Sequence, residues 1–553
     1  RRIIDAAIGE RGFYQFDDMI HVPEGSWLNW PWAYDYLLAL ALRVALFVRP
    51  DMQPMQFLAY VPVLWVFVNT GLMTLIARSA GLGPVATAIG LLVFSLSPLT
   101  QNLHGLGLID HHFIELSFVL ATVLAGQRFF AQPGGPAAIA LGVLLGVAVG
   151  FHNGLFILQL PVLAAVLLLW LRGAGLPRPS LQALAASLAG ATLLVLLPSA
   201  PFRDLQFEFW TLSWFHLYVA FGSAVVLTFV GWRSCSAKNL AVLAVIGALM
   251  IAPLLAKLVT GAAFVSGSLD IIGEITEVES PLARLGKPGG LGYVTMLYGW
   301  LFFAAPLVFV HQAWRLYRER DAASVFFAIM SLFGIALMLS QYRLHPFGFW
   351  ALIIGGLLGI EAAMRRFELS RLVTTVVTLA IVAVAIQPPL RNQLFARVPP
   401  GLDRDYAASV AIFPSLATAC TRRPGAVLSY RDDGHPIRYH SDCSVVTNNF
   451  LITPLHRRKV AESNRYLSMT PQQLVEAAPH IRYVFVRMLD IYEMRPGHVR
   501  PRTPDEIKRF NAPLFNALTF GDAIPPEFRL IDELRIDDGR DFAYVRIFEI
   551  VRN

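Results

Sequence analysis

Long apolar segments alternate with short polar ones over most of the chain, from about residue 56 to residue 388. Most of these segments are long enough to cross the ~30 Å hydrocarbon layer of a membrane as a helix. The pattern therefore predicts a multi-span α-helical membrane protein. About twelve segments fit this description, near 56–78, 84–100, 113–130, 137–151, 154–171, 181–199, 214–231, 239–260, 293–313, 322–340, 347–364 and 371–388.

The pattern changes after residue 390, where Arg, Asp, Pro and His become frequent and no spanning segment remains. Alternating runs at 426–430, 483–487 and 542–549 predict strands, whereas 404–419 and 471–478 predict helices. We therefore expect a C-terminal soluble α/β domain. The expected division of the chain is a first outer loop (1–55), a transmembrane domain (56–390) that includes a long outer loop (261–292), and the α/β domain (391–553).

Composition and charge agree with a membrane protein. Hydrophobic residues make up 56% of the chain and charged residues 15%, and the mean hydropathy is +0.55. Lys and Arg concentrate in alternate loops, for example at Arg128 and Arg365, and this bias marks the cytoplasmic side. Loops 101–112, 261–292 and 341–346 then lie outside, together with the C-terminal domain. Because much of the net charge of +7 is this topological signal, it requires no nucleic-acid partner.

The three cysteines are divided between the two sides of the membrane. Cys235 falls in a predicted cytoplasmic loop, where a thiol stays reduced. Cys420 and Cys443 fall in the outer domain, where a disulfide between them is chemically allowed. The alternative is a pair of buried free thiols.

The sequence begins with Arg1 and a polar stretch, 1–35, that we expect on the outer side. A chain needs a signal or a preceding span to reach that side. We expect a span before Arg1, and the alternative is a cleaved signal peptide.

A polar loop between two apolar segments carries the most informative residues. It ends in Asp110-His111-His112, and Glu115 follows one helical turn later. Asp and His two positions apart can place an oxygen and a nitrogen on one divalent cation. The alternative is that Asp110 only caps the helix that follows, although a cap does not explain two adjacent His and a Glu.

Three further outer segments carry polar residues that could meet this loop. Segment 21–36 is rich in Trp and Tyr, which interface anchoring alone would explain. The long loop offers Glu277, with Glu279 in reserve, to complete a metal shell, unless these are simply solvated charges. Arg343 lies at the outer end of a span and suits phosphate oxygens, although it could instead snorkel to the headgroups.

A cation site, carboxylates and an Arg at the lipid–water boundary suit an enzyme that acts on a phosphate-bearing lipid. The chain shows no P-loop, dinucleotide fingerprint or Ser-His-Asp set. A transporter or flippase of lipid-linked or anionic solutes is the alternative, and it would place polar groups near the bilayer midplane. The two are distinguished by whether Asp110, Glu277 and Arg343 share one outer cavity.

These residues resemble motifs of the catalytic subunit of oligosaccharyltransferase, including its single-subunit bacterial and archaeal forms. That family has thirteen spans, a GT-C fold and polyprenyl-linked sugar donors. The matching stretches are Pro23-Glu-Gly-Ser with Asn29-Trp-Pro, Asp110-His-His112, Ile275-Thr-Glu277-Val and Gln341-Tyr-Arg343-Leu. The family places a first metal Asp shortly before an Arg, so Arg1-Arg2 imply that this Asp precedes the sequence.

In the outer domain, Tyr430-Arg431-Asp432-Asp433-Gly434 stands where the family has Trp-Trp-Asp-Tyr-Gly, with Thr447-Asn448-Asn449 downstream. Asp432 and Gly434 match, and both Trp are absent. The resemblance therefore places Asp432, Gly434, Asn448 and Asn449 on the acceptor side and leaves the acceptor open between protein and glycan.

The resemblance implies a divergent bacterial glycosyltransferase that moves a sugar or oligosaccharide from a polyprenyl (pyro)phosphate to an acceptor. Asp110, His112 and Glu277 are expected to hold Mg²⁺ or Mn²⁺, with Asp110 and Glu277 in catalysis and Arg343 on the donor phosphate. The protein is expected in the bacterial inner membrane, with its C-terminal domain in the periplasm.

Overall fold

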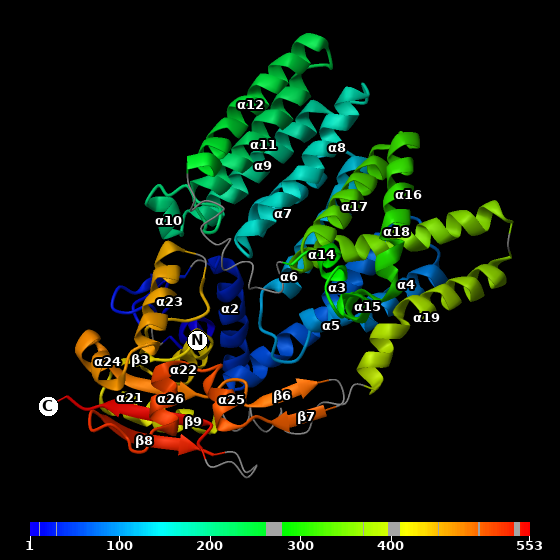
Figure 1. Cartoon of the computed structure of the whole chain (residues 1–553). Coiled ribbons are helices and arrows are strands. Elements are labelled where there is room, and N and C mark those ends of the chain that lie inside the picture. The colour runs from blue at the N-terminus through cyan, green and yellow to red at the C-terminus, as the bar shows by residue number, and fades with distance from the viewer. Residues whose placement is uncertain are drawn as a thin grey trace.

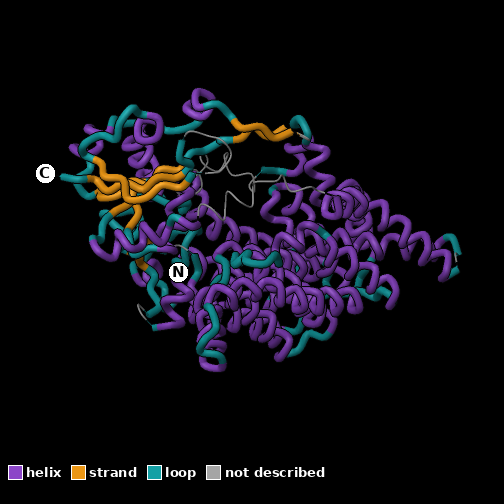
Figure 2. Tube along the Cα trace, turned by 90° about the horizontal axis from the view of Figure 1, so that it is seen from below, coloured by secondary structure: helices purple, strands orange, loops and turns teal. Residues whose placement is uncertain are grey.

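The molecule consists of a large helical part and a smaller part built around a sheet (Figure 1). This computed structural model describes residues 1–9, 12–28, 30–260, 279–368, 370–395, 410–451, 453–495, 498–535 and 542–552. Strands gather at one side of the molecule and the long helices occupy the other (Figure 2). The predicted fold class, a multi-span helical membrane protein with a C-terminal α/β domain, is confirmed.

Apolar helices occupy all twelve segments that hydropathy predicts. Among the described residues, nine helices are long and apolar enough to cross a membrane, and three are shorter. The long ones are α3 (Pro54–Ser79), α6 (His112–Ala131), η1 (Asn153–Leu158) with α8 (Gln159–Leu171), α9 (Arg178–Leu196), α11 (Trp214–Trp232), α12 (Ala237–Thr260), α15 (Gly290–Tyr298) with η4 (Gly299–Ala304) and α16 (Ala305–Arg318), α17 (Ala322–Ser340), and η5 (Tyr342–Leu344) with α18 (His345–Arg366). The shorter ones are α4 (Pro84–Leu96), α7 (Gly135–Ala148) and the apolar part of α19 (Arg371–Phe395).

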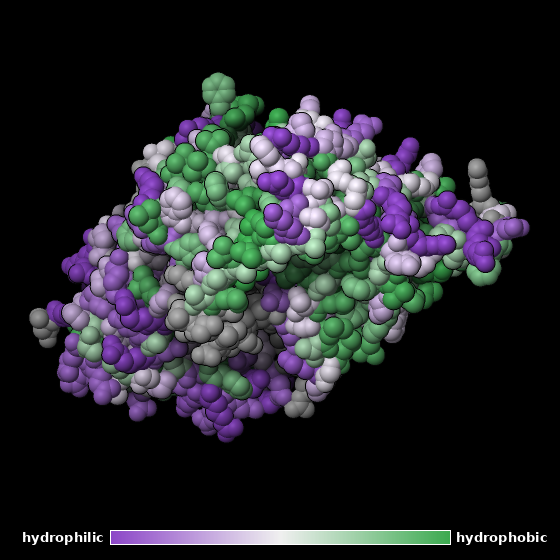
Figure 3. All heavy atoms as spheres, turned by 90° about the horizontal axis from the view of Figure 1, so that it is seen from above, coloured by the Kyte–Doolittle hydropathy of each residue, from purple (hydrophilic) through white to green (hydrophobic). Residues whose placement is uncertain are grey.

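Large apolar side chains on the surface of the helical part fit contact with lipid. Phe67 and Leu307 are each 74% exposed, and Leu194 and Leu249 are each 68% exposed. The face in Figure 3 is mostly hydrophilic at lower left, whereas hydrophobic residues spread across its middle and right. In water such a surface would associate with other molecules, but a bilayer covers it.

Helices α7 and α9 approach each other closely because two glycines lie between them. A Cβ on Gly142 would lie 2.7 Å from the carbonyl oxygen of Leu184, and one on Gly146 would lie 2.8 Å from that of Leu188. Small residues at such positions allow van der Waals contact between helix backbones, which drives helix association in lipid. Replacing either glycine by Ala would push α7 away from α9.

In the described residues before α3, the helices and strands are short. These are α1 (Arg2–Ile8), the hairpin β1 (Phe16–Asp17) with β2 (Ser26–Trp27), and α2 (Trp32–Val48). Other short helices in the outer and connecting loops are α5 (Pro98–Leu103), α10 (Ala200–Arg203) and α14 (Pro281–Leu285).

The C-terminal part is a mixed five-stranded sheet in the order β4-β3-β5-β9-β8. Strand β3 is parallel to β4 and β5, whereas β9 is antiparallel to β5 and β8. The central residues of β5, 483–486, are all buried, as expected for a strand covered on both faces. The strands are β3 (Ala426–Leu428), β4 (Ser444–Val445), β5 (Ile481–Arg487), β8 (Phe528–Leu534) and β9 (Val545–Ile550), with a separate hairpin of β6 (Tyr492–Arg495) and β7 (His498–Pro501).

The surrounding helices are α21 (Phe413–Arg422), η6 (Arg431–Asp433), α22 (Gly434–His440), α23 (Pro454–Leu467), α24 (Pro471–Ala477), α25 (Pro504–Lys508) and α26 (Pro513–Phe520). Three of the strands and α24 coincide with segments predicted from the sequence, and α21 overlaps the predicted helix 404–419. Residues 404–409 of that prediction lie outside the described residues.

A disulfide joins Cys420 at the end of α21 to Cys443 just before β4. The two Cα atoms are 5.3 Å apart, and both side chains are fully buried. The bond ties a helix to the edge of the sheet. Cys235 is free and exposed, in the connection between α11 and α12.

The N-terminal segment docks onto that same sheet edge. The Val22 N–H donates to the Val445 carbonyl over 3.3 Å, and the Val445 N–H donates to the Met19 carbonyl over 2.9 Å. The buried Lys459 ammonium donates to the Val22 carbonyl and forms ion pairs with Glu24 and, 2.9 Å away, with Glu462. The segment before α2 is therefore held between the helical part and the outer domain.

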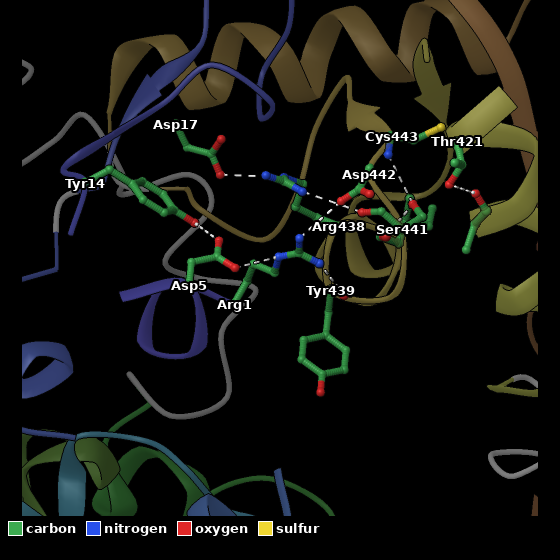
Figure 4. Close-up of polar contacts among 12 residues, drawn as sticks. Arg1, Asp5, Tyr14, Asp17, Thr421, Arg438, Tyr439, Ser441, Asp442 and Cys443 are labelled. Carbon is green, nitrogen blue, oxygen red and sulfur yellow. Dashed lines mark hydrogen bonds and ion pairs between the residues drawn. The ribbon is translucent and has the colours of Figure 1, made fainter. Parts of the chain in front are cut away.

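Two arginines add contacts at this junction between the N-terminal segment and the outer domain (Figure 4). Arg1 lies 3.0 Å from Asp5 and 3.1 Å from Asp442, and Arg438 of α22 lies 3.7 Å from Asp17. Arg438 and Asp17 are both buried, so this pair is screened little by solvent.

We expect this junction to weaken as the pH falls from 7 to 5. His21 and His456 stack with ring centroids 4.5 Å apart, and both are fully buried. Burial lowers the pKa of His21 to about 3, helped by the nearby His456, His435 and Lys459, and burial lowers the pKa of His456 to about 4. The undocked segment therefore binds more protons, so docking is strongest above the ordinary pKa of about 6.5 and is lost as the pH falls toward 4.

Each ring contributes up to about 2 kcal/mol of this loss between pH 6.5 and 5. Hydrogen exchange at the Val22 and Val445 amides, corrected for the intrinsic effect of pH, measures it. Equal protection of both amides at pH 7 and pH 5 would contradict the expectation.

Candidate metal centre at the outer helix ends

The start of α6 places the Asp110 loop at one end of the helical part. Asp110 accepts a hydrogen bond from the His111 N–H over 2.7 Å, and α6 begins at His112. The residue in the capping position is His111, whose side chain makes no capping bond. Capping of α6 by Asp110 therefore does not explain why these residues are here.

Asp110, His111 and His112 form a compact group of donor atoms. His111 Nδ1 lies 2.6 Å from Asp110 Oδ1, and His112 Nε2 lies 3.5 Å from Asp110 Oδ2. One ligand atom from each residue lies within 4.8 Å of the other two. The Asp110 side chain is 59% exposed, so a cation can reach it from solvent at this end of the helical part. A carboxylate with imidazoles is a donor set that suits a divalent metal ion.

The environment of Asp110 keeps its carboxyl ionised, as a metal ligand must be. Loss of hydration raises its pKa, but the hydrogen bond and charge of His111 and the charge of His112 outweigh this. The net pKa lies below the ordinary value for Asp.

A buried carboxylate lies directly behind this group. Glu115 is one turn after His112 on α6, and its side chain is 6% exposed. Its Oε2 contacts His112 Nδ1, and its Oε1 contacts His152 Nδ1. A carboxylate on one ring nitrogen fixes the orientation of an imidazole, so Glu115 turns His112 Nε2 toward Asp110.

His152 is a site residue that the sequence analysis missed, whereas Trp30 belongs to segment 21–36, one of the segments that could meet this loop. His152 follows α7 and stacks on His111 with ring centroids 4.7 Å apart. Trp30 from the first outer segment lies 4.9 Å from the His111 ring and 6.3 Å from the His152 ring. A signal for His152 existed, because the alternation of spans places residues 152–154 on the outer side.

Arg343 lies at the same end of the helices. It follows α17 in η5 and is within electrostatic reach of His112 and His152. Among the described residues, no acidic side chain forms an ion pair with it, which leaves the guanidinium available to an anion. The Tyr342 N–H donates to the Glu279 carbonyl over 2.9 Å, so the end of the long outer loop is tied to this turn.

The predicted outer-loop ligand, Glu277, lies outside the described residues, so its place in the metal shell stays a prediction. The reserve candidate Glu279 is paired with Lys287 over 2.7 Å and with Arg284 over 3.4 Å. Its carboxylate is thus already engaged by two cations.

Gly434 and Asn448 of the predicted acceptor-side set lie together. A Cβ on Gly434 would lie 2.2 Å from the Thr447 carbonyl oxygen and 2.9 Å from Asn448 Cα, so only glycine allows this contact. Asp432 and Asn449, in contrast, are exposed.

Asp433, the neighbour of the predicted Asp432, is the acidic residue that points inward. It is buried and lies 2.7 Å from Arg487 Nε. Burial raises the pKa of Asp433 to about 6, against the opposing effect of Arg487.

A cavity of about 280 Å³ lies between the N-terminal segment and the outer domain. It is lined on one side by Arg2, Trp30 and Asp35 and on the other by Arg438, Asn448 and Phe450. Because Trp30 also covers His111 and His152, the cavity is next to the donor-atom cluster.

Neither a protein-family model nor a curated protein matches the sequence. Solved structures do match. The archaeal oligosaccharyltransferase AglB from Archaeoglobus fulgidus, in complex with an inhibitory peptide and a dolichol-phosphate, superposes with a TM-score of 0.71 over 99% of this chain and 83% of that chain, at 14% identity. The chain has the oligosaccharyltransferase fold.

Two further structures of the Archaeoglobus fulgidus enzyme give the same result. The form tethered to an acceptor peptide containing the NVT sequon gives a TM-score of 0.72 at 15% identity, over 99% of this chain and 83% of that chain. The complex with Zn and sulfate gives a TM-score of 0.65 at 16% identity, over 96% of this chain and 74% of that chain. The oligosaccharyltransferase fold therefore extends over the spanning helices and the outer domain together.

Proposed function

We propose that this protein is a membrane glycosyltransferase that moves a sugar or oligosaccharide from a polyprenyl (pyro)phosphate to an acceptor. The observation that carries the proposal is the cluster of Asp110, His112 and Arg343 at one end of the spanning helices, beside the outer domain. Lipid phosphates lie at this depth, and the cluster offers a cation site and a guanidinium that has no acidic partner among the described residues. The oligosaccharyltransferase fold supports the same reaction class.

Asp110 and His112, together with Glu277 from the outer loop, would hold Mg²⁺ or Mn²⁺, which when bound screens the charge that grows on the departing phosphate. The mixed oxygen and nitrogen donors suit Mn²⁺ better than Mg²⁺. Arg343 binds the donor phosphate through paired N–H groups. Glu115 keeps His112 in its ligating orientation, and Trp30 shields the cluster from the side of the first outer segment.

The acceptor enters from the outer domain in this proposal. The segment from Asp432 to Asn449 borders its path, and Asn448 lines the cavity beside Trp30. The similar structures were solved with an inhibitory peptide and a dolichol-phosphate in one case and with a tethered acceptor peptide in the other, which supports a lipid-linked donor and an acceptor outside the membrane. The reaction takes place on the periplasmic side of the bacterial inner membrane.

The position of the cluster favours an enzyme over a transporter or flippase. Asp110 precedes α6, His152 follows α7, and Arg343 lies between α17 and α18, so all three belong to one face of the helical part. A carrier would place such groups along a path through the bilayer midplane.

The test is transfer by the full-length protein in lipid nanodiscs, supplied with a polyprenyl pyrophosphate that carries a labelled sugar. Candidate acceptors are a sequon peptide and a lipid-linked glycan, each assayed with Mn²⁺ and with a chelator. We expect a labelled acceptor only when a divalent cation is present. Recovery of the intact donor with every acceptor, together with its passage across liposomes, would overturn the proposal in favour of a flippase.

A further inference from the structure

We infer that His111, Glu115 and His152 form a second metal site, directly behind the Asp110–His112 site and suited to Zn²⁺ or a similar transition-metal ion. One ligand atom from each of the three residues lies within 4.8 Å of the other two. Ligands on a single Zn²⁺, each about 2.0–2.2 Å from the metal, are about 3–4 Å apart, so small shifts close the shell. Two imidazoles and one carboxylate are a frequent protein ligand set for Zn²⁺.

The charge of Glu115 supports a cation at this position. Its side chain is only 6% exposed, and both of its oxygens face imidazole nitrogens. A buried carboxylate requires a compensating positive charge close to it. A divalent ion held by Glu115 and the neighbouring imidazole nitrogens supplies this charge.

An unpartnered nitrogen points to the same conclusion. His111 is 8% exposed, and its Nδ1 is engaged by Asp110. Its buried Nε2 has no hydrogen-bond partner among the described residues. Buried polar atoms are almost always satisfied, so this nitrogen requires a ligand, and the stacked His152 ring lies 4.7 Å away.

The outer site, with Asp110 and His112 as its proposed ligands, and the inner site differ in depth, and His111 lies between them. Asp110 is 59% exposed at the outer surface, whereas Glu115 and His152 are 6% and 16% exposed behind it. The inner ion fixes Glu115, and Glu115 contacts His112 of the outer site. The inner ion therefore positions a ligand of the outer ion without contacting the donor phosphate.

The experiment measures bound metal and does not depend on transfer. Full-length protein in nanodiscs is stripped with a chelator, loaded with Zn²⁺ alone, separated from free ion and analysed by mass spectrometry. We expect two ions per chain in the wild type, one in His152→Gln and one in Asp110→Asn. His311→Gln is the matched control, because His311 lies elsewhere in the helical part, on α16, and we expect it to keep two ions.

Each remaining outcome decides between the two sites. A single ion in the wild type that is lost in Asp110→Asn and kept in His152→Gln overturns the inner site and leaves the proposed function intact. Two ions in Asp110→Asn with one in His152→Gln support the inner site and contradict the metal role of Asp110. The zinc X-ray absorption spectrum of Asp110→Asn gives a second measurement, and it should show imidazole nitrogens around the remaining ion. A spectrum with oxygen ligands only would overturn the inference.

Discussion

Asp110→Ala is expected to lower sugar transfer by about 10³-fold or more, which is the scale of losing charge stabilisation on a leaving group. The carboxylate is ionised and exposed, and it faces His112 Nε2 over 3.5 Å. The fold should survive, because the side chain is 59% exposed and its contacts are to the adjacent His111 and to His112. Initial rates with a labelled polyprenyl-linked sugar, beside a thermal unfolding curve, measure both effects.

Asp51→Ala is the matched control for this variant. Asp51 is 78% exposed, pairs only with the nearby Arg49 among the described residues, and should leave transfer unchanged. Turnover at the wild-type rate in Asp110→Ala would remove the metal role of this residue. A loss of transfer together with a lower unfolding temperature would assign it a structural role instead.

The spanning helices follow from the sequence because a bilayer imposes one simple requirement. About twenty apolar residues must be consecutive, and this requirement acts along the chain. All twelve predicted segments are apolar helices, and the strands at 426–428, 481–487 and 545–550 also match the alternating runs. The sheet order β4-β3-β5-β9-β8 was not predictable in this way, because it depends on contacts between distant segments.

The candidate site shows the same difference between residues that are close in sequence and contacts between distant segments. Asp110, His112 and Glu115 lie within six positions, so the geometry of a helix start brings them together. His152 joins them only because α6 and α7 are neighbours, and Trp30 joins them only because the first outer segment docks onto the outer domain. Sequence alternation could place both on the outer side, but it could not identify their contacts.

The adjacent acidic residues Asp432 and Asp433 of the outer domain show a second limit of predicting site residues from sequence. The resemblance to family motifs selected Asp432, which is 57% exposed, whereas Asp433 is buried against Arg487. Neighbouring positions on a short 3-10 turn point in different directions, so a shift of one residue exchanges a solvent-facing group for a buried one. A motif match in which three of five positions are changed cannot resolve that choice.

Arg343→Ala is expected to lower kcat/KM for the lipid-linked donor by about 10²–10³-fold. The guanidinium has no acidic partner among the described residues, and each charge-assisted bond that it makes to phosphate is worth about 1.5–3 kcal/mol. Since the phosphate is bound before and during transfer, the donor KM should rise and kcat should fall. Arg343→Lys keeps the charge but loses the paired geometry, so it should restore only part of the activity.

Arg203→Ala provides the comparison, because Arg203 is a second arginine at a helix end on the predicted outer side, and it is exposed. It should leave the donor KM unchanged. The decisive measurement is donor binding to the metal-free protein, where Arg343→Ala should weaken affinity and Asp110→Ala should not. Equal donor affinity in wild type and Arg343→Ala would mean that this arginine serves membrane anchoring, and the donor phosphate would then have to be bound by other groups of the cluster.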